Sequence, residues 1–237
     1  MSASRPAIAP QIPIAIRDGA TRVSPLNVPD ALWLWLAVAG LGLFHGINPA
    51  MGWLFAVALG LNRRSERIVW LALLPIGLGH ALAVAVVLFA VLALGLIVEP
   101  ALLRPLAAVI LFAWAAWHAL YGRRHKVRFG MQVGLGGLFM WSFLMANAHG
   151  AGLMLIPAVI PLCLAGSPAH ALTSGASALV ALTVLGVHTA ATLVTIGIVS
   201  VIVYKWVGVA FLRHGWINLD LVWTLALIVC GFLLLAI

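Results

Sequence analysis

Four histidines lie near the middle of long apolar runs: His45, His80, His149 and His188. An ionisable side chain inside a bilayer normally faces the interior of the helix bundle and marks a functional site. Neutral imidazole is also the commonest protein ligand for zinc, copper, nickel and iron. The four histidines are therefore candidate ligands of a transition-metal ion. The alternative is that each one only hydrogen-bonds a carbonyl group across helices and helps packing.

Other polar and soft side chains occur at the same level of the runs. Asn48 and Asn147 could add oxygen ligands to a metal site or orient the imidazole rings around it. Three methionines would favour Cu(I) if their sulfur atoms faced the site, although methionine more often fills gaps in an apolar core; they are Met51, Met145 and Met154.

Carboxylates do not occur near the middle of the runs, because Glu99 and Asp220 lie at the ends. A site without fixed negative charge suits an ion that must also be released, and histidines that change protonation could couple its movement to protons. We therefore expect a metal ion as substrate and no permanent cofactor. Two alternatives stay open: a membrane haem protein, since transmembrane histidines also ligate haem, and a non-catalytic accessory or assembly protein with structural histidines. We do not expect an enzyme, since neither HExxH nor a Ser-His-Asp set is visible.

The composition is that of a polytopic membrane protein. Of 237 residues, 65% are hydrophobic and only 8% are charged, whereas soluble domains carry about 25% charged residues. The apolar runs reach the length of about 20 residues that a bilayer-crossing helix needs. The net charge of +8 comes from basic residues at run ends, which is a topology signal, so we expect a lipid bilayer and no nucleic acid as partner. A homo-oligomer stays open.

Six apolar runs predict six transmembrane helices, near 31–61, 68–97, 101–121, 131–162, 176–203 and 217–237. The basic loops 62–67 and 123–128 should face the cytoplasm, as in a bacterial inner-membrane protein. Residues 1–30 contain five prolines and no signal-peptide core, so we expect a flexible tail.

The two halves of the chain contain similar patterns. His-Gly recurs at His45 and His149, and a glycine shortly before a histidine recurs at His80 and His188, with offsets of 104 and 108 residues. Three helices per copy invert the second copy, so an inverted repeat of 31–122 and 131–237, joined by loop 123–130, is expected. Helices one and four should be broken near mid-membrane, at Gly46, Pro49, Gly52, Gly150 and Pro157.

The sequence resembles the LysE-type exporter superfamily, nearest in character to its nickel/cobalt efflux and nickel/cobalt permease branches. The resemblance rests on the two-times-three-helix plan and on His45, Asn48, Pro49, Gly52 and His80. It implies a secondary transporter or exporter of a transition-metal cation, nickel- or cobalt-like, with copper and zinc as further candidates. The chain departs from those branches at Asn48 and Met51, where they typically carry a second His or an Asp, and its 3–4 loop holds only His125.

Side chains near the run ends have two interpretations. His118 and Tyr121 close the third run and could gate an exit from the site, or could anchor the helix at the membrane interface. Five tryptophans also lie toward run ends, as interface anchors do: Trp33, Trp35, Trp114, Trp117 and Trp141.

Overall fold

The computed structural model describes residues 28–95, 98, 100–121, 134–164, 175–207 and 219–236. Within these ranges the chain is all-helical, with no strand. The principal elements are α1 (Val28–Ile47), α2 (Trp53–Arg63), α3 (Glu66–Gly95), α4 (Pro100–Tyr121), α5 (Leu135–Ala148), α6 (Ile156–Leu164), α7 (Gly175–Ile202) and α8 (Leu219–Ala236). The predicted tail and the loop 123–130 lie outside the described residues, apart from the first residues of α1.

The helices follow the six predicted runs, and the first run is broken as expected. Between α1 and α2 the backbone forms a short 3-10 helix, η1 (Pro49–Met51). Proline lacks the N–H group that would continue α1, and Gly52 adopts a φ of 121°, which disfavours residues with a Cβ. Gly46 lies inside α1 rather than at the break.

The fourth run is also broken, at Gly150 as predicted but not at Pro157. α5 ends at Ala148, Gly150 has a φ of 71°, and a 3-10 helix, η3 (Leu153–Leu155), leads into α6. The prediction that Pro157 breaks the helix is wrong. Pro157 is the second residue of α6, and proline is tolerated in a first helical turn because those N–H groups have no intrahelical partner.

Three helices are long and apolar enough to cross a membrane, or four if a bent pair counts as one span. The three are Glu66–Gly95, Leu102–Tyr121 and Ala178–Trp206, and the pair is Leu135–Ala148 with Leu153–Cys163, bent by 51°. Apolar segments of α1 and α8, Leu32–Ile47 and Leu221–Ala236, are shorter. The described chain is therefore consistent with a membrane protein.

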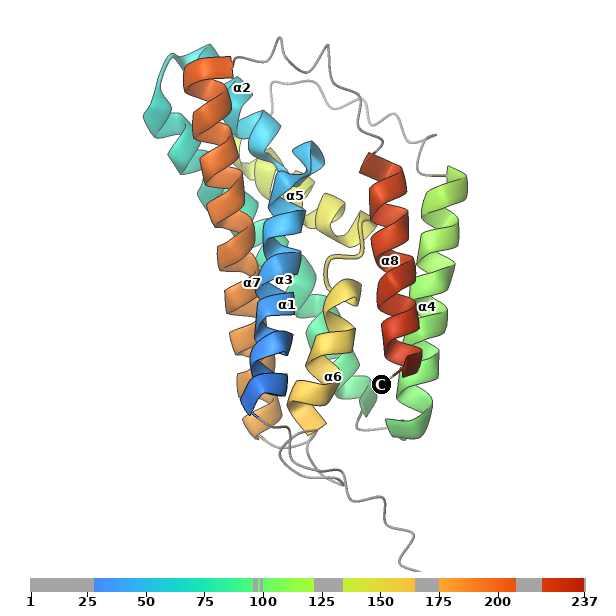
Figure 1. The fold of residues 1–237 in the computed structure, drawn as a ribbon. Helices are drawn as coiled ribbons and strands as arrows, with labels where there is room; N and C mark the ends of the chain where they lie inside the picture. Colours follow the sequence, from blue (N-terminus) through green and yellow to red (C-terminus); the bar gives the residue numbers. More distant parts are fainter. Residues whose placement is uncertain are drawn as a thin grey trace, which may run out of the picture.

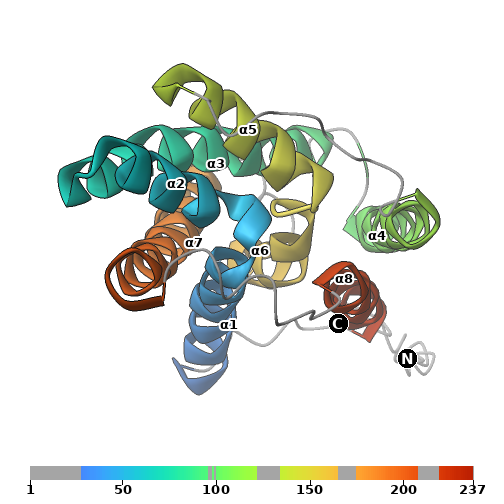
Figure 2. The ribbon, with the colours of Figure 1, turned by 90° about the horizontal axis from the view of Figure 1, so that it is seen from above.

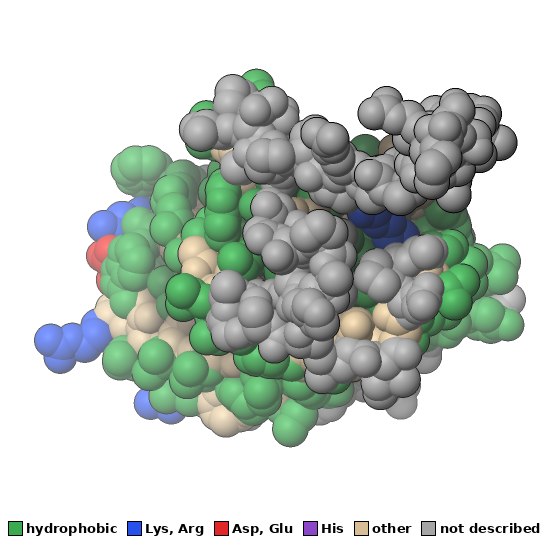
Figure 3. Space-filling model, turned by 90° about the horizontal axis from the view of Figure 1, so that it is seen from below, with side chains coloured by type: hydrophobic (Ala, Val, Ile, Leu, Met, Phe, Trp, Pro, Cys, Tyr) green, Lys and Arg blue, Asp and Glu red, His purple; other side chains and the backbone are tan. Residues whose placement is uncertain are grey.

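The outward faces of the helices support the same conclusion. Along α3, exposed apolar side chains recur at helical spacing: Leu71, Leu74, Leu78, Leu82, Val86 and Phe89. In water such a stripe would be a large apolar patch, whereas lipid tails accept it. Apolar side chains also predominate among the described residues of the face seen from below (Figure 3). Where charges occur, as in the Lys205–Glu66 pair with N and O 3.0 Å apart, they lie at helix ends.

The long helices pack in pairs from opposite halves of the chain. α1 lies along α7, α3 lies along α5, and α4 lies along α8, while α3 and α7 also contact each other (Figure 1). Seen from above, α4 and α8 stand to one side of the other helices, with α6 nearest to α8 (Figure 2).

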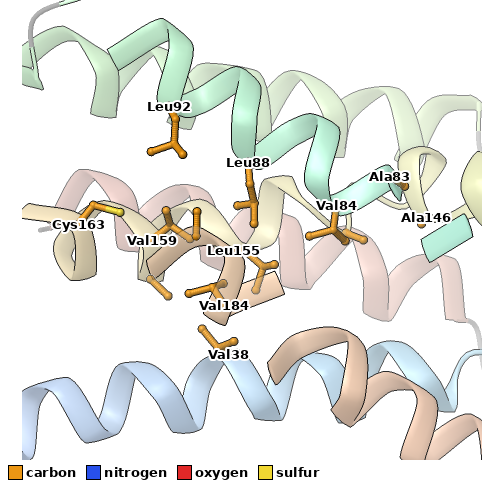
Figure 4. Packing of buried hydrophobic residues seen from close by; sticks show 13 residues of the cluster. Val38, Ala83, Val84, Leu88, Leu92, Ala146, Leu155, Val159, Cys163 and Val184 are labelled. Carbon is orange, nitrogen blue, oxygen red and sulfur yellow. The ribbon is translucent and has the colours of Figure 1, made fainter. Parts of the chain in front are cut away.

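Glycine permits a close backbone approach between α3 and α5. A Cβ atom added at Gly79 of α3 would lie 2.3 Å from the carbonyl oxygen of Phe139 in α5, so only glycine fits there. Small residues at helix contacts have this role in lipid, where hydrophobic burial contributes little. One of the buried clusters joins α1, α3, α5, α6 and α7 through interdigitating side chains, among them Val38, Leu88, Leu155 and Val184 (Figure 4).

Candidate histidine site

Three of the four predicted histidines form one buried group, the three-histidine cluster: His45 on α1, His80 on α3 and His188 on α7. Their ring centroids lie 5.8 Å (His45–His80), 5.1 Å (His45–His188) and 5.3 Å (His80–His188) apart. The three side chains are at most 2% exposed. Two come from the first half of the chain and one from the second, so the halves do meet at imidazoles.

Glycines on α1 allow this meeting. A Cβ at Gly42 would lie 2.5 Å from the carbonyl oxygen of His188, and one at Gly46 would lie 2.6 Å from that of Thr192. Because neither residue has a Cβ, α1 approaches the backbone of α7 closely. His45 lies between these glycines in the sequence and is thereby placed beside His188.

Backbone carbonyl groups hold two of the rings in one tautomer. His45 Nδ1 lies 3.1 Å from the carbonyl oxygen of Leu41, and His188 Nδ1 lies 3.4 Å from that of Val38. Since a carbonyl oxygen only accepts, each Nδ1 must carry the proton, which leaves the lone pair on Nε2. Within the described residues, Nε2 of His45, His80 and His188 has no hydrogen-bond partner. A histidine that binds a metal has this arrangement, with one nitrogen fixed by a carbonyl and the other available.

The distances between the three rings suit ligands of one shared ion, but the side chains are not positioned to coordinate it. Two imidazoles that bind one metal at about 2.0–2.1 Å have ring centres roughly 5 to 6.5 Å apart. Even so, across the described parts of the chain no group of three or more His, Cys, Asp or Glu side chains is positioned to hold a metal ion. Binding by this cluster therefore requires the rings to turn.

The fourth predicted ligand, His149, lies in a different place. It follows the last residue of α5, and its ring contacts His118 of α4 at a centroid distance of 5.3 Å. Trp223 of α8 contacts His45 at 4.5 Å and His149 at 5.1 Å. The structure thus divides the predicted set into the three-histidine cluster and a separate His118–His149 pair, with Trp223 in contact with both.

The two residues of the predicted gate have different surroundings. His118 is 6% exposed and lies beside His149, so it is not an interface anchor. Tyr121 is 47% exposed at the end of α4.

The asparagines make local hydrogen bonds. The Asn48 side-chain oxygen accepts from the backbone N–H of Ala50 at 3.0 Å and so caps η1. The Asn147 side chain donates to the carbonyl oxygen of Phe143 at 2.8 Å. Met51 and Met154 are buried in two separate apolar clusters, which is the gap-filling role.

Tryptophans satisfy carbonyl groups freed at the first helix break. Trp53 Nε1 donates to the carbonyl oxygen of Ile47 at 2.9 Å, and Trp141 of α5 donates to that of Ala50, also at 2.9 Å. A break inside a membrane leaves carbonyl groups without a helical partner, and each unsatisfied group costs several kcal/mol. The expectation that Trp141 anchors the interface is therefore wrong, because its indole lies against the break.

The second break is satisfied in the same way. Trp114 of α4 donates to the carbonyl oxygen of Ala148 at 3.0 Å, and Trp223 donates to that of His149. Trp114 is thus also no interface anchor. Sequence reasoning missed Trp223 as a site residue, although its offset of 105 residues from His118 lies between the offsets of 104 and 108 on which the predicted repeat rests and could have identified it.

No protein-family model, curated protein or solved structure shows significant similarity to this chain.

Proposed function

We propose that this protein is a secondary transporter or exporter of a transition-metal cation, and that the cation binds at the three-histidine cluster during its passage. One observation carries the proposal: three buried imidazoles from three helices leave their Nε2 atoms without a hydrogen-bond partner in the described chain. A histidine that served packing alone would be expected to use both nitrogens, since an unsatisfied buried polar group is costly.

The absence of carboxylates in the cluster fits a passing ion. Imidazole suits zinc, copper, nickel and cobalt, whereas hard cations prefer oxygen ligands. Three neutral ligands bind a divalent ion less tightly than a charged site does, which favours release. In this proposal the rings turn to bring their Nε2 atoms to one point when the ion enters.

The helix pairing supports an architecture of six spans in two inverted repeats. If the helices of residues 31–122 correspond in order to those of residues 131–237, then an exchange of the halves turns the α1–α7 pair into the α5–α3 pair. The same exchange leaves the α4–α8 pair unchanged. Together with the α3–α7 pair, which the exchange also leaves unchanged, these are the extensive pairings between the halves in the described chain. The breaks in the first helix of each half also correspond, as in transporters that bind substrate where broken helices meet.

In this proposal the chain is an inner-membrane protein of the LysE type, with loops 62–67 and 123–128 in the cytoplasm. Exposed arginines at Arg63, Arg64 and Arg67 support that orientation of the first loop. The ring contacts favour an ion over haem, because a porphyrin needs an open slot between its two axial imidazoles and these rings contact one another.

Cobalt binding tests the proposal. The full chain is purified in detergent and titrated with Co²⁺, whose visible absorption reports nitrogen coordination, and transport is followed in vesicles that contain a metal-sensitive dye. We expect binding and transport in the wild type, and loss of transport and of Co²⁺ binding at the three-histidine cluster in His45→Gln and His188→Gln. His170→Gln, outside the described residues, is the matched control.

Two results would contradict the proposal. Folded wild-type protein that binds no Co²⁺, Ni²⁺, Zn²⁺ or Cu⁺ would exclude the ion, and a Soret band in the purified protein would favour haem. Full binding and transport in the folded His45 and His188 variants would leave the cluster a structural role.

A further inference from the structure

A second group of imidazoles lies outside the three-histidine cluster. His118 on α4 and His149 at the α5–α6 break have ring centroids 5.3 Å apart, with the ring planes tilted by 60°. They are 6% and 8% exposed, so both are buried. This spacing falls within the roughly 5 to 6.5 Å expected for two imidazoles that share one ion at about 2.0–2.1 Å. Two buried rings from different helices thus lie at ligand spacing a second time.

Trp223 lies between this pair and the three-histidine cluster. Its ring is nearly perpendicular to those of His45 and His149, at interplanar angles of 80° and 88°. The indole is fixed on two sides, because Nε1 donates to the carbonyl oxygen of His149 and the ring stacks on Phe44 at 4.9 Å. At 1% exposure it fills the space between the two groups.

The repeat explains why the two groups differ. His118 and Trp223 are 105 residues apart, close to the offsets of 104 and 108 that relate the other histidines. The contact of His118 with His149 therefore corresponds to the contact of Trp223 with His45, with the halves exchanged. The first half supplies an imidazole at the position where the second half supplies an indole.

We propose that His118 and His149 form a second binding station for the same class of transition-metal cation, and that Trp223 is the partition between the two stations. This inference rests on the proposed function. A cation that crosses the protein binds first to one group of imidazoles and then to the other, and the indole must move aside for the transfer. Two ligands hold the ion less firmly than three, so the pair is the weaker station.

The experiment is a Co²⁺ titration of the full chain in detergent, with the bound metal counted by mass spectrometry after equilibrium dialysis. We expect two equivalents of Co²⁺ in the wild type and one in both His118→Gln and His118→Phe, the second of which keeps an aromatic ring in place. His188→Gln should retain only the weaker equivalent. His170→Gln serves as the control and should retain both.

Transfer between the stations has its own readout. Trp223→Phe keeps a ring on Phe44 but removes the indole donor and part of the partition. We expect this variant to bind two equivalents of Co²⁺. In stopped-flow absorption, the slow phase that follows the initial binding, which reports transfer between the stations, should be faster than in the wild type.

The outcomes separate this inference from the proposed function. One equivalent in the wild type, lost in His188→Gln and retained in both folded His118 variants, would overturn the second station and leave the transporter proposal intact. Loss of both equivalents in a folded His118 variant would show one site rather than two. A folded wild type that binds none of Co²⁺, Ni²⁺, Zn²⁺ and Cu⁺ would overturn both proposals. If the His118 variants do not fold, His149→Gln tests the same pair.

Discussion

The substitution Gly42→Ala should disrupt the three-histidine cluster without touching a histidine. The new Cβ would lie 2.5 Å from the carbonyl oxygen of His188 and 2.8 Å from the Cβ of Ala191. The first atom belongs to the backbone of α7 and cannot rotate away. Carbon atoms pack best at about 3.5–4.0 Å, so α1 must move from α7 by about 0.7–1.2 Å.

That movement has an energetic and a functional consequence. Overpacking of this kind costs about 1–3 kcal/mol, and the same shift separates His45 from His188, whose rings are 5.1 Å apart. Metal–ligand distances tolerate about 0.2 Å. We therefore expect a lower free energy of unfolding by about 1–3 kcal/mol and Co²⁺ affinity lower by about 10- to 100-fold, the range seen when ligands lose their orientation.

Gly40→Ala is the matched control, because a Cβ at Gly40 on the same helix meets no atom within 4 Å. Alanine is the better helix former by about 0.8–1.0 kcal/mol, so this variant should be slightly more stable than the wild type. Stability is measured by thermal unfolding in detergent and affinity by Co²⁺ titration. If Gly42→Ala matches Gly40→Ala in both measurements, α1 and α7 do not cross as closely as described, and the reasoning fails.

Two further substitutions test how the helix breaks are stabilised. Trp114→Phe removes the donor to the Ala148 carbonyl group and should lower the free energy of unfolding by about 1–3 kcal/mol, the cost of a buried unsatisfied group. The control Trp33→Phe, at a side chain that is 69% exposed, should change the free energy of unfolding little. Equal effects of the two variants in thermal unfolding would show that the indole hydrogen bond is unimportant. Asn48→Ala removes the cap of η1 and should lower the free energy of unfolding by about 0.5–2 kcal/mol, whereas Asn48→Asp keeps an acceptor for the cap. If both variants unfold at the same temperature as the wild type, the cap contributes nothing to stability.

The residue pattern predicts positions along a helix better than contacts between helices. The apolar runs and the break at Pro49 follow from chain-local effects, namely hydropathy and the missing N–H of proline, and both occur as expected. The predicted grouping of His149 with the other three histidines does not occur, because matching offsets predict equivalent positions in a repeat and not contact. In the proposed exchange of halves, His149 takes the place of His45 and need not touch it.

Tryptophan is ambiguous for a related reason. Its ring is both apolar and a hydrogen-bond donor, so it suits the membrane interface and equally suits a carbonyl group freed in the core. The position of Trp141 near a run end favoured the interface. The location of its partner, the Ala50 carbonyl group, depends on the packing of α5 beside η1, which no local pattern in the sequence predicts.

In the proposed transporter, the same tryptophans restrict which ions the core can bind. A broken helix in lipid exposes carbonyl oxygens, the ligands that hard cations such as Na⁺, Mg²⁺ and Ca²⁺ prefer. Here the indoles engage carbonyl groups at both breaks, among them those of Ile47 and Ala148, and the backbone N–H of Ala50 engages the Asn48 oxygen. In the proposed transporter, an ion that reaches the three-histidine cluster meets imidazole nitrogen rather than free carbonyl oxygen at these positions. The proposal therefore predicts selectivity for a borderline or soft cation, supported by the hydrogen bonds that stabilise the breaks.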